Sequence, residues 1–283
     1  MARRMATSLT TAWRLTPSAP DRSVPVTGAS ASRRIATRLE RRCSEGVWVT
    51  TDQVYEAAPN AHTRVNRYGG TMDIVDPRIE AYTASLHARY DEPVVLEMEA
   101  EARASGFPIV GRNVGVTLWT LAAAIGARRV FELGSGFGYS ALWFAKATGP
   151  AGEIHLTDGD PENERKASDA LRRAGVWDVM HYHLGDALTS FAQVEGEFDI
   201  VYDDIDKDGY PDAWRAARDR VRIGGLYICD NTLWYGRVPP DGEPPDGVTE
   251  AIREHNAMVA ADERYVTTIL PIRDGVLVAT RVT

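Results

Sequence analysis

Residues 130–140 read Val-Phe-Glu-Leu-Gly-Ser-Gly-Phe-Gly-Tyr-Ser, and the apolar segment Ala-Leu-Trp-Phe-Ala follows at 141–145. An apolar run, a glycine-rich turn and a second apolar segment in this order predict a β-strand, a tight turn and an α-helix. Glycines in such a turn let a ligand approach the backbone closely, as nucleotides do in α/β folds. The same pattern also fits a strand-to-helix turn that binds no ligand, so the choice between the two interpretations depends on the neighbouring residues.

The rest of the chain continues this alternation. Strands are predicted at 129–133, 153–157, 179–183, 198–203, 226–230, 265–270 and 276–281, the last two joined by Asp274-Gly275 as a hairpin. Helices are predicted from Pro77 after the N-cap Asp76, and at 93–105, 114–125, from 161 to Gly175, 211–221 and 248–260. The order predicts an α/β fold: a doubly wound, mainly parallel seven-stranded sheet with helices on both faces and a C-terminal antiparallel hairpin.

Three residues near the glycine-rich turn bear on which nucleotide it would bind. The dinucleotide fingerprint G-x-G-x-x-G needs glycine at position 139, where this chain has Tyr139. Glu132 lies just before the turn, where its carboxylate would repel a pyrophosphate and suit a ligand with ammonium and sulfonium charges. Asp158 follows the next predicted strand, at a place where an acid can bind ribose hydroxyls. These features favour S-adenosylmethionine over NAD, and an NAD-dependent oxidoreductase of Rossmann type is the alternative.

Oxygen-bearing side chains follow two other predicted strands. Asp204 comes directly after 198–203, and Asp230 with Asn231 lies at the end of 226–230. Carboxylate and amide oxygens are ligands of hard divalent cations such as Mg²⁺. Lys207 follows Asp204 by three residues, close enough to take a proton from a hydroxyl bound at such a cation. The pattern predicts a metal-assisted deprotonation site.

The competing interpretation is a calcium-binding EF-hand, because residues 204–209 fit the start of its loop, D-x-D-x-D-G. That loop requires a bidentate glutamate six residues after its glycine, and this chain has Arg215 there. Residues 198–202 also read as a strand where an EF-hand needs a helix. The sequence therefore excludes an EF-hand.

From about Met72 to the C-terminus the chain resembles the cation-dependent O-methyltransferases, which include the catechol and caffeoyl-coenzyme A O-methyltransferases. The resemblance rests on the stretches at 131–140, 185–188, 198–210 and 230–234. The last two are the most specific, because they carry the oxygen ligands and the lysine together in the expected order. The resemblance implies a class I methyltransferase fold and methyl transfer to a small phenolic acceptor with two adjacent hydroxyls.

The resemblance also implies roles for individual residues. Asp204, Asp230 and Asn231 would hold the cation, most simply Mg²⁺, and Lys207 would be the general base. Residues implied to line the S-adenosylmethionine site are Val110, Glu132, Gly134, Ser135, Gly136, Ser140, Asp158, Asp186, Ala187 and Asp204. The hydrophobic residues that surround the phenol in the family are matched only in part, by Trp234 and Tyr235. A non-catalytic S-adenosylmethionine-binding or metal-binding protein is a further alternative, and a homodimer is left open.

Several other side chains are expected to have ordinary structural roles. Asp203 and Asp206 adjoin the predicted ligands and are expected to be solvated acids. His181 and His183 alternate along a predicted strand without a further ligand at metal spacing, and are expected to be surface or hydrogen-bonded histidines. Cys229 lies in an apparent buried strand and is expected to be an inert core thiol. The proline-rich stretch 239–245 is expected to be a connecting loop, with a substrate-contacting lid as the alternative.

Charge divides the chain into two parts. Residues 1–71 hold 11 Arg and 5 acids, a net charge of +6, whereas residues 72–283 carry −14. The first part is rich in Ser, Thr, Ala and Pro without a periodic apolar face, which predicts a low-order extension. It also resembles a transit peptide, and an upstream start, with Met72 as the natural initiator, is the interpretation that we favour. Residues 72–283 are the predicted methyltransferase domain.

Composition narrows the class of partner. The acidic body argues against nucleic-acid phosphates as ligands. No apolar run approaches the ~18 residues of a membrane span. The two cysteines, Cys43 and Cys229, lie far apart, so no disulfide is implied and a reducing compartment, the cytoplasm, is expected. These observations leave a small molecule as the expected partner.

Overall fold

The structure, a computed structural model, describes residues 48–50, 53–55, 74–240 and 245–283. The chain divides into two units, residues 1–64 and 65–283. In the first, strands Trp48–Thr50 (β1) and Gln53–Tyr55 (β2) form an antiparallel pair. Most of the predicted extension lies outside the described residues, as do Cys43 and part of the proline-rich stretch 239–245, so the interpretations of these segments stay predictions.

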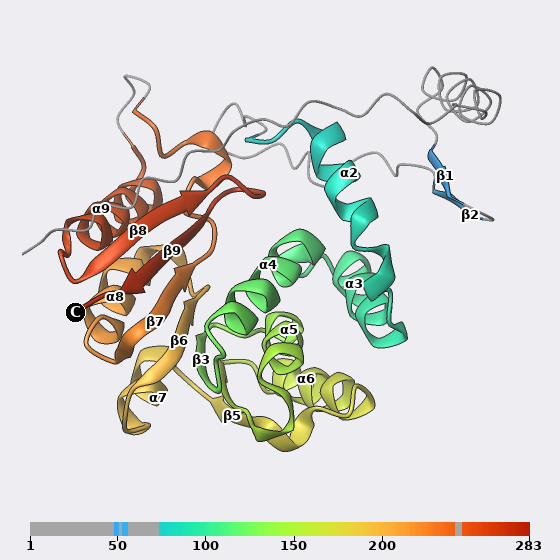
Figure 1. Ribbon diagram of the computed structural model, residues 1–283, viewed down its shortest axis with the longest axis horizontal. Coiled ribbons are helices and arrows are strands. Elements are labelled where there is room, and N and C mark those ends of the chain that lie inside the picture. Colours follow the sequence, from blue (N-terminus) through green and yellow to red (C-terminus); the bar gives the residue numbers. More distant parts are fainter. Residues whose placement is uncertain (1–47, 51–52, 56–73, 241–244) are drawn as a thin grey trace, which may run out of the picture. The chain divides into compact units, whose positions relative to one another are not determined.

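The second unit is built on a seven-stranded sheet in the order β5-β4-β3-β6-β7-β9-β8 (Figure 1). Its strands are Arg129–Leu133 (β3), Glu153–Asp158 (β4), Met180–Leu184 (β5), Phe198–Asp203 (β6), Val221–Cys229 (β7), Tyr265–Leu270 (β8) and Val276–Arg281 (β9). The pairs among β3 to β7 are parallel, and β9 is antiparallel to both β7 and β8. This confirms the predicted fold class.

Helices cover both faces of this sheet. They are Pro77–Leu86 (α2), Pro93–Ser105 (α3), Gly111–Ala124 (α4), Tyr139–Thr148 (α5), Pro161–Arg173 (α6), Ala187–Gln193 (α7), Tyr210–Ala217 (α8) and Gly247–Ala261 (α9). One apolar core joins the sheet to α3, α4, α5 and α6, and a second joins its other face to α7, α8 and α9. Figure 1 shows α4, α5 and α6 on one side of the strands and α8 and α9 on the other.

Capping residues fix several of the predicted helix ends. The carboxylates of Asp76 and Asp160 accept hydrogen bonds from backbone N–H groups in the first turns of α2 and α6, and each is followed by proline at the first helical position. Gly106 ends α3 in the left-handed conformation that glycine adopts without strain. Helix α7 was not predicted, although its N-cap Asp186 accepts a hydrogen bond from the N–H of Thr189 at 2.7 Å.

One predicted boundary is wrong. The sequence placed a helix over 211–221 and a strand over 226–230, but α8 ends at Ala217 and β7 already begins at Val221. Val221 is fully buried and pairs with Phe198. Gly224 and Gly225 interrupt the apolar pattern inside β7, and the pairing with β6 shifts register there, so the first half of the strand lacks its usual signal.

The strand order determines where a ligand can bind. From β3 the chain proceeds through β4 to β5 on one side and then returns to the other side of β3 with β6. In open α/β sheets, ligands bind at the carboxyl ends of the strands where the order reverses, here between β3 and β6. The glycine-rich turn follows β3 and Asp204 follows β6. Within the described residues no helix is long and apolar enough to cross a membrane.

Candidate active site

The glycine-rich turn is held against the end of β6 by close backbone contact. Gly134 has a φ of +81°, and a Cβ atom there would lie 2.7 Å from the backbone oxygen of Asp204. The N–H of Asp204 donates to the oxygen of Leu133 at 2.9 Å, which fixes the two strand ends together. Only glycine combines this conformation with this approach. The turn therefore brings the first predicted cofactor residues directly beside the first predicted metal ligand.

Glu132 lies fully buried beneath this turn. One of its carboxylate oxygens accepts a hydrogen bond from the hydroxyl of Ser140, and the other, Oε2, is buried without a partner among the described residues. Burial raises the pKa of Glu132 to about 8, because the ionised carboxylate lacks solvation there, and the charge of Asp204 adds to the effect. A buried carboxylate with an open oxygen is a site for a cationic or hydrogen-bond-donating group of a ligand.

The other residues predicted for the cofactor extend from this centre along neighbouring strands. Val110 is buried at the start of α4, and Ser135 is buried in the turn, where its N–H donates to the oxygen of Thr157 at 2.7 Å. Asp158 is half-buried at the end of β4, and its Oδ1 accepts from Asn163 Nδ2 at 3.1 Å. Asp186 and Ala187 are farther along the same edge, after β5. The turn residues, Asp158 and Asp186 follow the parallel strands β3, β4 and β5, whereas Val110 belongs to the segment before α4.

The predicted metal ligands lie at the ends of the neighbouring strands β6 and β7. Asp230 is 1% exposed, and its N–H donates to the oxygen of Asp203 at 3.1 Å. Burial raises its pKa, and the negative charges of Asp204 and Asp274 raise it further. Its Oδ1 is buried without a hydrogen-bond partner among the described residues. A cation placed beside such a buried, unpartnered carboxyl group would stabilise its ionised form.

Asn231 is oriented by a residue that sequence reasoning missed. Its Nδ2 donates to Asp274 Oδ2 at 2.8 Å, which leaves the amide oxygen to face away from Asp274. Asp274 is buried and lies in the β8–β9 turn, which is brought here because β9 pairs with β7. From the sequence, Asp274-Gly275 predicts only a hairpin turn. The acid is also part of the electrostatic field of the site.

Lys207 makes an ion pair with Asp204. Its Nζ lies 2.9 Å from Asp204 Oδ1 and donates to the oxygen of Ile205 at 3.1 Å. Burial by itself would lower the pKa of Lys207, but the charge of Asp204, the hydrogen bond that Asp204 accepts from Lys207 and the charge of Asp230 together outweigh burial and raise the pKa. For Asp204, burial raises the pKa and the Lys207 ammonium opposes the rise. The predicted base therefore lies next to the predicted ligand, and its protonation depends on the charge that Asp204 carries.

The interpretation of Asp203 as a solvated acid is wrong. Asp203 is fully buried on the opposite face of the sheet, and its Oδ2 accepts a hydrogen bond from the Tyr227 hydroxyl at 2.7 Å. That hydroxyl lies 2.9 Å from His255 Nε2, and Asn256 links His255 to the backbone oxygen of Thr232. Burial raises the pKa of Asp203 to about 7 and lowers that of His255 to about 4. Helices α8 and α9 cover this face, which alternation along the strand could not reveal.

This network also contains a possible alternative cation site. Asp203, Cys229 and His255 form the one group of His, Cys, Asp or Glu within the described ranges whose ligand atoms lie within 4.8 Å of one another. Sulfur and imidazole donors suit zinc rather than magnesium. However, the Tyr227 hydroxyl already connects Asp203 to His255, so these groups satisfy one another without a cation. We interpret the network as a support that joins α9 to the strand end carrying Asp230.

Removal of the Tyr227 hydroxyl tests that support. Tyr227→Phe leaves two buried polar groups, Asp203 and His255, without their shared partner, so the free energy of unfolding should fall by about 1–3 kcal/mol. Tyr265→Phe is the matched control, because its hydroxyl donates to one backbone oxygen, that of Arg218, at 2.6 Å and bridges no buried titratable pair. Urea denaturation of both variants measures the difference. Equal losses for the two would contradict a special role for the network.

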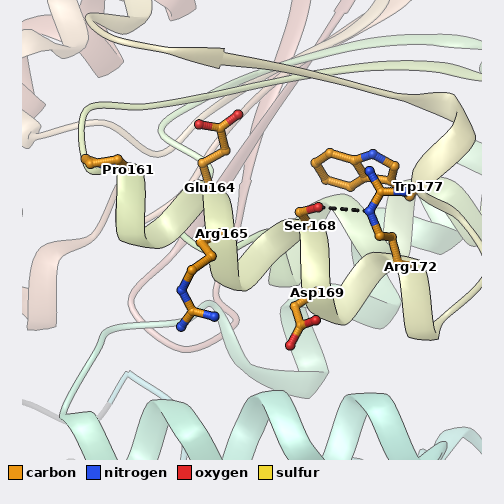
Figure 2. Close-up of a pocket in the computed structure, with 7 residues that line it drawn as sticks. All are labelled: Pro161, Glu164, Arg165, Ser168, Asp169, Arg172 and Trp177. Atoms are coloured by element: carbon orange, nitrogen blue, oxygen red, sulfur yellow. Dashed lines mark hydrogen bonds between the residues drawn. The ribbon is translucent and has the colours of Figure 1, made fainter.

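A separate hollow lies over helix α6. It has a volume of about 500 Å³ and is lined by α6 residues from Pro161 to Arg172 together with Trp177. Figure 2 shows Arg172 beside Trp177 and hydrogen-bonded to Ser168, with Glu164, Arg165 and Asp169 along the same helix. None of the predicted site residues lines it, and its polar wall is typical of a solvated helix surface. The predicted roles of the strand histidines are confirmed: His183 Nε2 lies 2.9 Å from His155 Nδ1, and His181 is exposed.

A model of the O-methyltransferase family matches residues 89–282, more than two thirds of the chain. This chain belongs to the O-methyltransferase family. Caffeoyl-CoA O-methyltransferase 1 of Eucalyptus globulus is 32% identical over 209 residues, covering 70% of this chain and 85% of that protein. Caffeoyl-CoA O-methyltransferase 5 of Nicotiana tabacum is 33% identical over 180 residues, covering 60% and 75%. The resemblance stated from the sequence is confirmed.

Solved structures similar to this O-methyltransferase are also methyltransferases. A methyltransferase from Geobacter sulfurreducens matches with 30% identity and a TM-score of 0.65, covering 76% of this chain and all of that one. The O-methyltransferase from Bacillus cereus, solved in complex with SAH, matches with 25% identity and a TM-score of 0.66, covering 72% and 97%. The alternative of an NAD-dependent oxidoreductase is therefore wrong.

Proposed function

We propose that this O-methyltransferase transfers the methyl group of S-adenosylmethionine to one hydroxyl of a catechol-type small molecule, with the help of a divalent cation. The observation that carries the proposal is that Asp230, Asn231 and the Asp204–Lys207 pair lie at the ends of two adjacent strands, beside the glycine-rich turn. Two relatives are named for caffeoyl-CoA, and one solved neighbour is a complex with SAH, which supports the same chemistry.

The residues around Glu132 fit the cofactor. S-adenosylmethionine carries an ammonium group, a sulfonium group and ribose hydroxyls, and the open Oε2 of buried Glu132 offers an acceptor in a site of negative charge. Gly134 lets the backbone turn close beneath such a ligand, and Asp158 lies at the end of the next strand, where an acid can bind ribose. A pyrophosphate would instead meet the carboxylate of Glu132.

The residues around Asp230 fit a hard cation. The unpartnered Oδ1 of Asp230, the carboxylate of Asp204 and the amide oxygen of Asn231 are all oxygen donors, which magnesium prefers. Asp274 holds the Asn231 amide so that its nitrogen is already occupied, an arrangement typical of groups that orient a ligand from behind. When bound, the cation would lower the pKa of an acceptor hydroxyl and fix its position.

The chain's own residues then supply the remaining steps. Lys207, 2.9 Å from Asp204, is placed to take the proton of the reacting hydroxyl once it has lost its own. The turn at Gly134 and the start of α4 at Val110 hold the methyl donor against the same edge of the sheet, so that donor and acceptor share one geometry. Burial keeps the carboxylates of Glu132 and Asp230 out of contact with bulk water.

Acceptors that differ in one hydroxyl test the proposal. Methyl transfer from labelled S-adenosylmethionine should occur with catechols, dihydroxybenzoates, flavonoids or hydroxycinnamoyl thioesters that carry adjacent hydroxyls. It should fall by a factor of at least ~10² for the matched compound in which one hydroxyl is already methylated, since an ether oxygen cannot lose a proton and binds a hard cation much more weakly than a hydroxyl. It should also stop in excess EDTA and return with magnesium. Full activity in EDTA, or equal rates on both compounds of a pair, would contradict the cation-dependent mechanism.

A further inference from the structure

Arg273 adopts a backbone conformation that arginine rarely takes. It lies in the β8–β9 turn with a φ of +53°, in the left-handed region that glycine favours. The residue that follows is Asp274, which orients Asn231. Non-glycine residues in this conformation cost of order 1 kcal/mol or more, and they cluster at binding sites, where the side chain is needed in one place. The strained conformation of Arg273 therefore points to a role for its side chain.

Arg273 is half-buried, and its guanidinium is incompletely paired. Its Nη1 donates to the backbone oxygen of Ile109 at 2.8 Å, next to Val110 at the start of α4. Within the described residues it makes no ion pair, although the charges of Asp230, Asp274 and Asp204 act on it. A guanidinium has five N–H donors in a fixed fork. Most of this donor capacity is therefore available at the boundary of the proposed active site.

A hollow of about 380 Å³ opens beside this side chain, between α2, α4 and the β8–β9 turn. That volume lies in the range of small-molecule sites. Arg273 is its one arginine or lysine among the described lining residues, and Glu80, its one carboxylate, is exposed. His87 Nδ1 and Asn113 Oδ1 are further buried polar atoms in its wall. The lining offers a cation and polar groups on an otherwise mainly apolar surface.

We propose that Arg273 is a specificity-determining residue that binds a carboxylate on the methyl acceptor. The acceptor would then be a dihydroxy aromatic acid, with its hydroxyls toward Asp230 and its carboxylate on Arg273 at the mouth of the hollow. This assignment rests on the proposed function and adds to it the anionic group that the acceptor carries. The arginine fork matches a carboxylate with two parallel hydrogen bonds, and the pinned Nη1 leaves the fork pre-oriented.

Paired acceptors test the role of Arg273. The native chain should methylate a dihydroxybenzoate or dihydroxycinnamate with kcat/KM about 10- to 100-fold higher than the matching methyl ester, the range expected for a charge-assisted bidentate contact. Arg273→Gln should abolish this preference by raising KM for the acid and leave the ester nearly unchanged. Arg273→Lys should keep part of it. Arg273→Gly removes the side chain in a residue that accepts the turn conformation, so it controls for strain.

Two further measurements separate the possible outcomes. Binding of SAH, measured by calorimetry, should be the same in native and Arg273→Gln chains; a tenfold loss would mean that the arginine holds the cofactor's carboxylate and would overturn the proposal. Equal loss on acid and ester, or a native chain without preference for acids, would overturn it too. Binding of both acceptors to the SAH complex, followed by tryptophan fluorescence, gives the same comparison without turnover. An absence of methylation would thus count against the proposed function alone.

Discussion

Asp204→Asn should reduce methyl transfer by a factor of about 10³ or more. A bound cation contributes several kcal/mol to a transition state that carries negative charge on oxygen, and each 1.4 kcal/mol is a factor of about ten in rate. Asparagine keeps the size of the side chain but removes the charge that would hold the cation and that pairs with Lys207 at 2.9 Å. The measurement is kcat at saturating S-adenosylmethionine over a magnesium titration.

Asp206→Asn is the matched control for this substitution. Asp206 lies two residues away and is exposed, and the same charge is removed without touching the ligand set. Its activity should stay within about twofold of the native chain, and both variants should keep the native melting temperature within a few degrees. A fully active Asp204→Asn chain would show that Asp204 does not hold the cation. Equal losses in both variants would point to overall charge instead.

Much of the site was predictable because parallel strands place their carboxyl ends at one edge of the sheet. Four predicted site residues lie at or directly after the end of a predicted strand: Glu132, Asp158, Asp204 and Asp230. Because β3 pairs with β6, the strand ends that carry Glu132 and Asp204 are neighbours. Such positions depend only on local apolar runs and the turn that follows each run. They required no knowledge of helix packing, and the structure places them as the sequence indicated.

Residues positioned by tertiary packing were missed. Asp274 and Arg273 belong to a hairpin turn, and the sequence does not say whether β8 or β9 pairs with β7; because β9 does, the turn lies beside Asn231. Asp203 was misjudged for a similar reason. Alternation correctly assigns it to the face opposite Asp204, but the depth of its burial depends on α8 and α9, which pack over that face.

Helix α2 shows that a correctly predicted element does not reveal its tertiary contacts. Its cap and its apolar spacing are as expected, yet Ile79, Tyr82 and Leu86 are 58–64% exposed. Periodicity therefore identified the helix correctly without identifying what its apolar side chains contact. Helix α4 is also predicted, but it begins three residues earlier than expected, at Gly111 with a φ of +74°. The Arg273 side chain donates to the oxygen of Ile109 just before this start, a contact that the sequence pattern does not indicate.

Lys207→Gln should lower kcat by about 10²- to 10⁴-fold, the usual contribution of a positioned acid–base group. Glutamine can still donate a hydrogen bond toward Asp204, but it cannot accept the proton of the acceptor hydroxyl. Since a base acts in its deprotonated form, the native rate should rise with pH and then level off. The pKa of Lys207 is raised by the charge of Asp204, so a cation that offsets this charge should shift the rising limb to lower pH.

The pH profile separates a base from a structural charge. In Lys207→Gln the levelling should disappear, because the proton must leave to solvent and the remaining rate should keep rising with hydroxide concentration. Lys166→Gln is the control: Lys166 pairs with Glu101 on the surface, away from the strand ends, and its loss should leave the profile unchanged. Affinities for SAH and magnesium should remain near native in both. If Lys207→Gln instead lost SAH binding and kept its kcat and its pH profile, Lys207 would serve only to balance the charge of Asp204, and the acceptor's proton would have to leave by another route.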